Sequence, residues 1–496
     1  MRSHGYDNDG LLTGAGDETI TSDPGDGLIT GSTLGGVNSA LTYDGFGEPQ
    51  TDTVTNGATN LYSVGYTRDN LGRITQKIET VNGTTTTWLY GYDADGRLNA
   101  VTENGLPVAS YGYDQNGNRV SVNAAIIASY DNQDRLLTFG SNSYSYNANG
   151  ELLTKANSTG TTSYTWDALG NLLGAKLPSG TAITYLYDGQ NRLVGKQVNG
   201  KLTEGFLYDG QLEPVAELDG SGNVVEQFVY GSRPNVPDYI IKGGAEYKVI
   251  SDQVGSPVLI VNASTGAIAE QISYDAWGNI TSDSNPGFQP FGFAGGLYDA
   301  DTGLVHFGAR DYDPQTGRWI SKDPILFAGG ETNLYGYVVG DPINGLDPLG
   351  LFCLGCHLPT LPTSFENWAV GTADALSFNI GKIIRDEYDL GSPDLNTCSP
   401  AYFAGKLTGT AVNAAIGGVA AARSAAWAAA NARPLGRAAL LIGSLFTRAP
   451  DANVITPIVD VVKAEQNMQA FSEGATLETE AQRLAASHIE TPPPGG

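Results

Sequence analysis

Residues 84–98 read TTTTWLYGYDADGRL, and this stretch decides the fold of the chain. The aromatic residues at positions 88, 90 and 92 fall on one face of an extended strand, while Leu89 and Gly91 fall on the other. The carboxylate of Asp93 can accept a hydrogen bond from the backbone two residues on, and Gly96 can adopt positive φ. The stretch therefore predicts a strand, a tight turn and the start of a second strand at Leu98.

The same unit recurs along the first half of the chain. Between Tyr92 and Tyr208 successive units start 16 to 21 residues apart, a period that suits one β-hairpin per unit. A single hairpin is marginally stable, so we expect the units to propagate as one continuous sheet with aromatic ladders. The repeats begin at Tyr92-Asp93, Tyr113-Asp114, Tyr130-Asp131, Tyr146-Asn147, Trp166-Asp167, Tyr187-Asp188 and Tyr208-Asp209, with looser copies at Tyr43-Asp44, Tyr66 and Tyr274-Asp275.

Composition limits the class of protein. A chain of 496 residues predicts roughly two to four domains. With 65 Gly, 16% charged and 41% hydrophobic residues, it fits a turn-rich β protein better than a disordered one. The net charge of −26 argues against a nucleic-acid-binding surface on the repeats, because phosphate contacts need Lys and Arg. Three cysteines cannot form a disulfide framework, and the N-terminus shows no Sec-type signal.

Two binding functions compete with a purely structural interpretation of the repeats. The Asp-x-Asp-Gly segments at Asp7 and Asp93 resemble the start of a calcium loop, but no Glu stands at the spacing that such a loop needs. Exposed aromatic ladders can also stack on sugars, although in a repeat sheet they more often pack. We therefore expect no metal and no cofactor, and retain carbohydrate binding as an alternative.

The tract Gly296–Leu351 separates the repeats from an Ala-rich tail and carries an ordered set of motifs. With the repeats, these motifs resemble the YD-repeat (Rhs) family and its core-associated domain, of the polymorphic toxin type. The residues that carry the resemblance are Asp252-Gln253-Val254-Gly255-Ser256-Pro257, Tyr274-Asp275-Ala276-Trp277-Gly278, Ala309-Arg310-Asp311-Tyr312-Asp313-Pro314, Gly317-Arg318-Trp319, Asp323-Pro324, Gly329-Gly330, Asn333-Leu334-Tyr335 and Asp347-Pro348-Leu349-Gly350-Leu351.

The resemblance implies a mainly β fold in three parts. Residues 1–250 form a YD-repeat array that winds as a hollow β shell, residues 251–351 form the core-associated plug domain, and residues 352–496 form a variable C-terminal segment. The array is shorter than in the family, so we expect a partial shell, completed by upstream sequence or by a second chain. The chain opens inside a repeat, which favours a C-terminal piece of a longer protein.

The resemblance also implies a reaction, namely a single self-cleavage of the Leu351–Phe352 bond. By motif, Asp323 and Asp347 are the expected catalytic pair and Arg310 their helper. Two carboxyls in close contact do not both ionise easily, so one can activate water while the other donates a proton. Taken by themselves, Asp-Pro pairs are turn formers, and only the ordered set of motifs favours catalysis.

Residues 352–496 change to a helical period, which predicts an α-helical segment. Its uncharged run, residues 407–422, is short for a membrane span, so a packed soluble helical hairpin is favoured over insertion. Cys353, Cys356 and His357 match a haem-attachment pattern, although coincidence, zinc and redox roles are alternatives. We recognise no toxin family in this segment.

The leading hypothesis is a shell that cleaves itself after Leu351 and carries its own C-terminal segment as an effector, for delivery to competing bacteria or to a host. It implies a secretion-system component and an immunity protein as partners, and a secreted or cell-surface location. It also implies a single-turnover aspartyl peptidase. The alternatives are a surface adhesin that binds carbohydrate through the repeats, and a truncated, inactive fragment.

Overall fold

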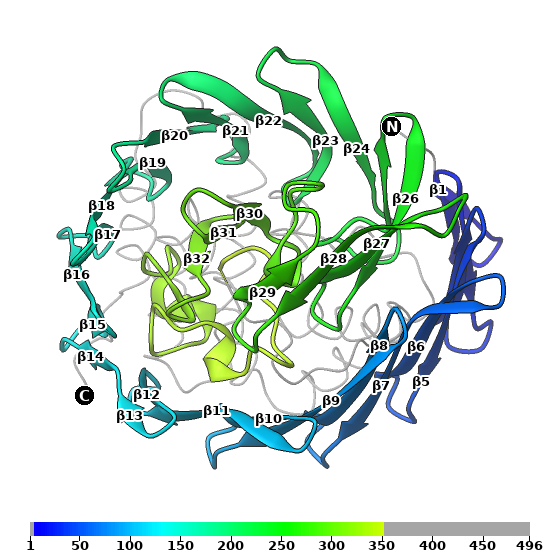
Figure 1. Ribbon diagram of the computed structural model, residues 1–496, viewed down its shortest axis with the longest axis horizontal. Coiled ribbons are helices and arrows are strands. Elements are labelled where there is room, and N and C mark those ends of the chain that lie inside the picture. Colours follow the sequence, from blue (N-terminus) through cyan, green and yellow to red (C-terminus); the bar gives the residue numbers. More distant parts are fainter. Residues whose placement is uncertain (1–3, 352–496) are drawn as a thin grey trace, which may run out of the picture. The chain divides into compact units, whose positions relative to one another are not determined.

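The computed structural model describes residues 4–351, which form three antiparallel sheets in chain order (Figure 1). The first sheet contains β1 (His4–Tyr6), β2 (Leu12–Ala15), β3 (Glu18–Ser22), β4 (Ile29–Leu34), β5 (Val37–Tyr43), β6 (Pro49–Asn56), β7 (Thr59–Arg68), β8 (Ile74–Val81), β9 (Thr84–Tyr92), β10 (Leu98–Glu103), β11 (Leu106–Tyr113), β12 (Arg119–Val122) and β13 (Ala125–Ile126).

The second sheet continues the same pattern. It contains β14 (Ala128–Tyr130), β15 (Leu136–Phe139), β16 (Asn142–Tyr146), β17 (Leu152–Asn157), β18 (Gly160–Trp166), β19 (Leu172–Lys176), β20 (Ala182–Tyr187), β21 (Leu193–Val198), β22 (Lys201–Asp209), β23 (Glu213–Asp219), β24 (Val224–Val229), β25 (Tyr239–Lys242), β26 (Ala245–Ser251), β27 (Pro257–Asn262), β28 (Ile268–Tyr274) and β29 (Ile280–Asp283).

The third sheet is small. It contains β30 (Leu297–Asp299), β31 (Leu304–Phe307), β32 (Arg310–Asp313) and β33 (Arg318–Trp319), and it is accompanied by the 3-10 helices η1 (Phe293–Gly295), η2 (Leu326–Gly329) and η3 (Val338–Gly340). In Figure 1 the long meander curves around these strands, which lie inside it.

Within each sheet every strand pairs with its neighbour along the chain, so the two long sheets form one winding meander. The meander continues past the break between β13 and β14, where the N–H of Ile127 donates to the carbonyl of Val120 at 3.0 Å. This arrangement confirms the predicted continuous array of hairpins. β26 crosses the predicted domain boundary at residues 250/251, and β27 to β29 extend the same sheet, so that division stays a prediction.

The turn after β9 has the predicted chemistry. Asp93 Oδ1 accepts hydrogen bonds from the N–H groups of Asp95 and Arg97 at 3.0 and 2.9 Å, and Gly96 adopts a φ of 88°. Asp93 Oδ2 also accepts a hydrogen bond from Nε of Arg97 at 2.7 Å. Because the turn itself uses both carboxylate oxygens, Asp93 serves as a structural anchor of the hairpin.

The repeat aromatics connect one unit to the previous one. Seven aromatic side chains each donate to a backbone carbonyl 11 to 18 residues upstream, at 2.5 to 3.0 Å. The donor and acceptor pairs are Tyr43 and Ile29, Tyr92 and Ile74, Tyr113 and Leu98, Tyr130 and Arg119, Trp166 and Leu152, Tyr208 and Leu193, and Tyr230 and Pro214. The ladder of aromatics predicted from the repeats is thus also a hydrogen-bonded ladder.

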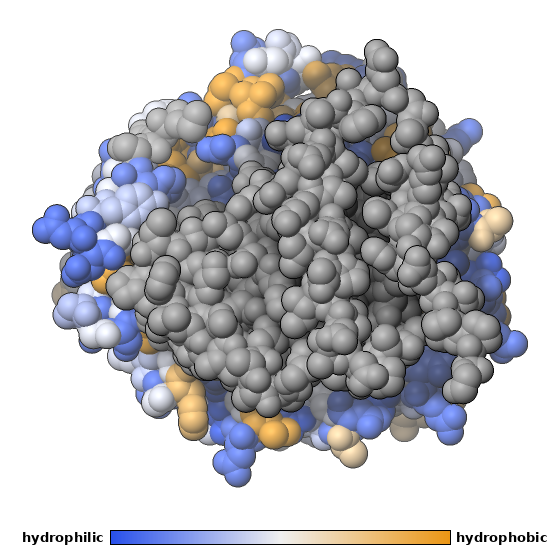
Figure 2. Space-filling model, turned by 180° about the vertical axis from the view of Figure 1, so that it is seen from behind, coloured by the Kyte–Doolittle hydropathy of each residue, from blue (hydrophilic) through white to orange (hydrophobic). Residues whose placement is uncertain are grey.

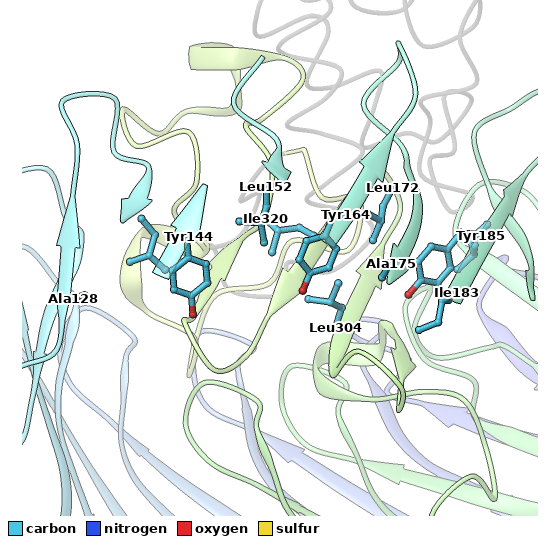
Figure 3. Close-up of a cluster of buried hydrophobic side chains, with 12 residues drawn as sticks. Ala128, Tyr144, Leu152, Tyr164, Leu172, Ala175, Ile183, Tyr185, Leu304 and Ile320 are labelled. Atoms are coloured by element: carbon cyan, nitrogen blue, oxygen red, sulfur yellow. The ribbon is translucent and has the colours of Figure 1, made fainter. Parts of the chain in front are cut away.

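The core follows one face of the meander and reaches the small sheet. On β9, Tyr90 is buried and Trp88 and Tyr92 pack beside it, while Leu89 is 41% exposed, as the alternation predicted. Figure 3 shows the cluster further along the array, where Leu304 and Ile320 of the small sheet region lie among side chains of the repeats. Burying this shared apolar surface stabilises the array and the inner region together.

The two ends of the meander meet by side-chain packing. Val37, Val54 and Tyr62 near the start pack against Leu259 and Val261 near the end. Two polar contacts also join the early and late strands. Lys248 forms an ion pair with the buried Glu18, and the N–H of Gly36 donates to the carbonyl of Ala263 at 2.7 Å. Among the described strands, the pairing order contains no ladder between β1 and β29, so packing closes the array.

Polar side chains dominate the rim of the face in Figure 2, with apolar patches between them. Large exposed apolar side chains include Phe46 and Leu71, both in repeat turns, at 82% and 65% exposure. Within residues 4–351, no helix is long and apolar enough to cross a membrane.

Candidate active site

Arg310 stands at the start of β32 and is only 4% exposed. Its guanidinium carbon lies 4.3 Å from the centre of the Trp319 ring, in a cluster of buried aromatics that also holds Phe307, Tyr312 and Tyr337. Arg310 Nε donates to the carbonyl of Gly350, and Nη1 donates to the carbonyl of Leu334 at 3.4 Å. The Arg310 side chain therefore holds the backbone at Gly350 while it is itself packed among buried aromatic residues.

One nitrogen of Arg310 contacts both predicted catalytic carboxylates. Nη2 lies 3.0 Å from Asp323 Oδ2 and 3.1 Å from Asp347 Oδ2. The two aspartates are 6% and 2% exposed. The structure thus brings together the three residues that the sequence motifs selected, in a geometry that sequence by itself does not provide.

Asp347 faces the backbone of the proposed cleavage point. Its Oδ1 accepts a hydrogen bond from the N–H of Leu351 at 3.1 Å, and its backbone carbonyl accepts one from Gly350 at 3.2 Å. Hydrogen bonds to a carboxylate favour its ionised form, as does the guanidinium of Arg310. These contacts hold the Asp347 carboxylate against the backbone of the proposed scissile bond.

Asp323 is held in the loop between β33 and η2. Its N–H donates to the carbonyl of Leu334 at 2.9 Å, and its Oδ1 accepts a hydrogen bond from the N–H of Ile325 at 2.9 Å. Burial raises the pKa of Asp323 to about 6 and the charge of Asp347 adds to the rise, while Arg310 and the Ile325 N–H act against it. Asp323 is therefore suited to the role of the protonated member.

The carbonyl of Leu351 lies on the Asp323 side of the site. A Cβ placed on Gly329 would stand 2.6 Å from Asp323 Oδ2 and 2.9 Å from the Leu351 oxygen, so both oxygens face the same side of this glycine. Phe352, the other residue of the proposed scissile bond, lies outside the described residues, as do Cys353, Cys356 and His357.

A small pocket opens onto this cluster and contains groups that the motifs did not select. Glu331 is the most notable, because it adds a third carboxyl to the site and follows directly after Gly329-Gly330. In the sequence, Glu331 is the one acidic residue between Asp323 and Asp341, and this position was the signal by which it could have been selected as a site residue. The pocket is lined by Arg310, Asp323, Leu326, Gly329, Glu331, Asn333, Leu334 and Gly336.

The arrangement provides two carboxyls in different environments, a shared cation and a peptide carbonyl beside them. These are the elements of peptide hydrolysis by an aspartate pair. Within the described part of the chain, no group of three or more His, Cys, Asp and Glu side chains could hold a metal ion.

The fold and the site together define a YD-repeat shell protein with an internal core region. A family model described as the teneurin YD-shell matches residues 2–343, and the chain belongs to this family. This agrees with the family resemblance in the sequence motifs and with the predicted mainly β shell.

Among known proteins, the chain is 31% identical over 352 residues to teneurin-4 of Mus musculus and 29% identical over 367 residues to teneurin-4 of Homo sapiens. Each match covers 67% of this chain and 12% of the teneurin, so the chain spans about an eighth of these relatives. It is also 30% identical over 273 residues to the tRNA3(Ser)-specific nuclease WapA of Bacillus spizizenii, covering 51% of this chain and 11% of the nuclease.

Solved structures of similar fold include the crystal structure of TcdB2-TccC3. It shares 18% sequence identity with this chain, with a TM-score of 0.38, and the match covers 67% of this chain and 22% of that one.

Proposed function

We propose that this YD-repeat shell protein cleaves itself once, after Leu351, and that residues 352–496 are the segment so separated. The supporting observation is that Asp323 and Asp347 share one nitrogen of Arg310 at 3.0 and 3.1 Å, beside the backbone of Leu351. The reaction is intramolecular, so proximity supplies much of the rate enhancement and one turnover suffices.

The chemistry divides between the two aspartates. Asp347, ionised, takes a proton from a water molecule, whose oxygen attacks the carbonyl carbon of Leu351. Asp323, protonated, donates its proton to the carbonyl oxygen, and Arg310 stabilises the negative charge around it. Collapse of the tetrahedral intermediate breaks the C–N bond as the proton held by Asp347 passes to the nitrogen of Phe352. One hydroxyl of the intermediate returns its proton to Asp323 as the C=O bond re-forms, which leaves a free carboxyl on Leu351.

The wider function is delivery of the separated segment. One of the relatives with this shell region is named as a tRNA-specific nuclease, which supports an effector role for a segment attached to such a shell. We infer that residues 352–496 are carried as cargo and act on a competing bacterium or a host cell. This role entails a secreted or cell-surface location, a secretion-system component and an immunity protein. The hairpins of this chain close by packing between β5–β7 and β26–β27, and a second chain or upstream sequence completes the shell by adding further hairpins to this ring.

Expression of the full chain tests the cleavage. The wild type is expected to yield two fragments, residues 1–351 and 352–496, with Phe352 as the new N-terminus by protein sequencing. Asp347→Asn and Asp323→Asn are each expected to leave one intact chain, since either change removes one half of the acid and base pair. Samples stay near neutral pH, because acid breaks Asp-Pro bonds chemically. A folded wild-type chain that remains intact would overturn the proposal.

A further inference from the structure

Glu331 lies in the wall of the pocket that also exposes Arg310 and Asp323, although no motif selected it. The groups whose charges act on it are Arg310, Asp323 and Asp347, which are the three residues of the candidate site. The pocket wall thus contains one guanidinium and two carboxyls, and the carboxylate of Asp347 acts on Glu331 through its charge.

The backbone around Glu331 is shaped to hold this side chain. Oε1 accepts a hydrogen bond from the N–H of Val339 at 2.7 Å. Val338 and Val339 adopt φ values of 45° and 55°, a left-handed conformation that β-branched residues rarely take. A Cβ on Gly336 would stand 2.3 Å from Oε2, so a larger residue there would displace the carboxyl from this position. Strained backbone of this kind persists where surrounding structure demands it, often at functional sites.

We propose that Glu331 is a positioning residue of the cleavage site and that it acts through Asp323, by placing a third carboxyl beside the catalytic pair. This inference rests on the proposed self-cleavage. Within residues 4–351, no hydrogen bond joins Glu331 to Arg310 or Leu351, so the effect that we propose is electrostatic.

The direction of this effect follows from the charges. Burial raises the pKa of Glu331 to about 7; the N–H of Val339 and Arg310 act against the rise, and Asp347 and Asp323 add to it. The negative charge of an ionised Glu331 favours the protonated form of Asp323, because like charges in the same pocket repel. Glu331 therefore extends the pH range in which Asp323 can donate, toward the alkaline side.

The test is the pH profile of self-cleavage in the full chain. Wild type and Glu331→Gln are made by brief cell-free synthesis and transferred to buffers from pH 5.5 to 8.5, and the intact fraction is followed with time. The amide oxygen of Gln can still accept the hydrogen bond from Val339. We expect Glu331→Gln to cleave at the wild-type rate at pH 5.5, about threefold more slowly at pH 7.5, and with its alkaline limb displaced to lower pH.

Glu270→Gln provides the matched control. Burial also raises the pKa of Glu270 to about 7, but this residue belongs to β28 and does not line the pocket. Its profile should match the wild type. A Glu331→Gln profile that keeps the wild-type shape, or that is slower by the same factor at every pH, overturns the role of Glu331 while leaving self-cleavage intact. An absence of cleavage in wild type instead overturns the proposed function itself.

Discussion

Asp347 combines the two interpretations that the Asp-Pro motif allowed. Its turn resembles that of the repeats, because Gly350 donates to the Asp347 carbonyl just as Gly96 donates to that of Asp93. In both turns the aspartate Oδ1 also accepts the N–H four residues on, which here belongs to Leu351. The turn former is thus the candidate catalytic residue, since the turn itself places the carboxylate against the proposed scissile bond.

Gly329 leaves space beside both Asp323 Oδ2 and the Leu351 carbonyl oxygen. Gly329→Ala would put a methyl group within 3 Å of both oxygens, and we expect cleavage to slow by at least tenfold with little loss of folding. Gel analysis of the full chain over time measures this change. Gly189→Ala is the control, because a Cβ there meets no atom within 4 Å and its cleavage should equal that of wild type. Equal rates for both variants would remove Gly329 from the site.

At the scale of the hairpin, an aspartate, an arginine and the tyrosine of the next unit form a set of contacts that recurs along the array, which we call the spine. Arg192 pairs with Asp188 within one turn at 2.6 Å and lies 5.3 Å from the ring of Tyr208 in the next unit. Tyr208 in turn donates to the carbonyl of Leu193 at 2.8 Å. These contacts require the next aromatic to follow at a fixed distance along the chain, which accounts for the near-regular period of the repeats.

Removal of one spine aspartate should weaken the array. Asp188→Ala deletes the acceptor for the N–H groups of Gln190 and Arg192, and we expect a loss of about 1–2 kcal/mol in the free energy of unfolding. Asp95→Ala, at a 72% exposed carboxylate that pairs with Arg97, should cost less than about 0.5 kcal/mol. Urea titrations of both variants in the Asp347→Asn background compare intact chains. Equal losses would contradict the anchoring role of the turn.

For the whole molecule, buried carboxyls set the pH dependence of stability. Burial raises the pKa of Glu204 and Glu270 to about 7, and that of Asp341 to about 6. The folded state therefore binds more protons than the unfolded state between about pH 4 and 7, so stability falls as pH rises through this window. The aspartates of the repeat turns have the opposite effect at lower pH, where their protonation destabilises the folded state. Burial acts to raise the pKa of Asp131 and Asp188, but hydrogen bonds from arginine side chains and turn N–H groups outweigh it and lower the pKa.

We accordingly expect the urea midpoint of the Asp347→Asn chain to be highest near pH 5 and to decrease toward pH 8, and also to decrease below about pH 4. Glu270→Gln should flatten the decrease between pH 5 and 8, because it removes one carboxyl that must ionise while buried. Unfolding curves measured at half-unit steps of pH test both points. A midpoint that rises steadily from pH 5 to 8 would contradict the raised pKa values of these buried carboxyls.

Local patterns in the sequence determined the elements of this protein and the identity of the catalytic candidates. Alternating aromatics and Asp-x-x-Gly turns predicted the hairpins, because strand period and turn chemistry depend on residues close in the chain. The family motifs indicated Arg310, Asp323 and Asp347. Sequence spacing also allowed both a catalytic and a turn-forming interpretation of Asp347; the fold shows the turn, and its conformation is compatible with the proposed catalytic role.

Only the tertiary structure decided which distant groups meet. The contact of the two aspartates with one guanidinium nitrogen, the carbonyl of Leu351 beside Gly329, and the approach of Glu331 to the pocket all depend on segments brought together by folding. So does the closure of the array by packing between β5–β7 and β26–β27. Burial and charge act through space, and for that reason the raised pKa of Asp323, which supports its proposed role as proton donor, could not be obtained from the order of residues.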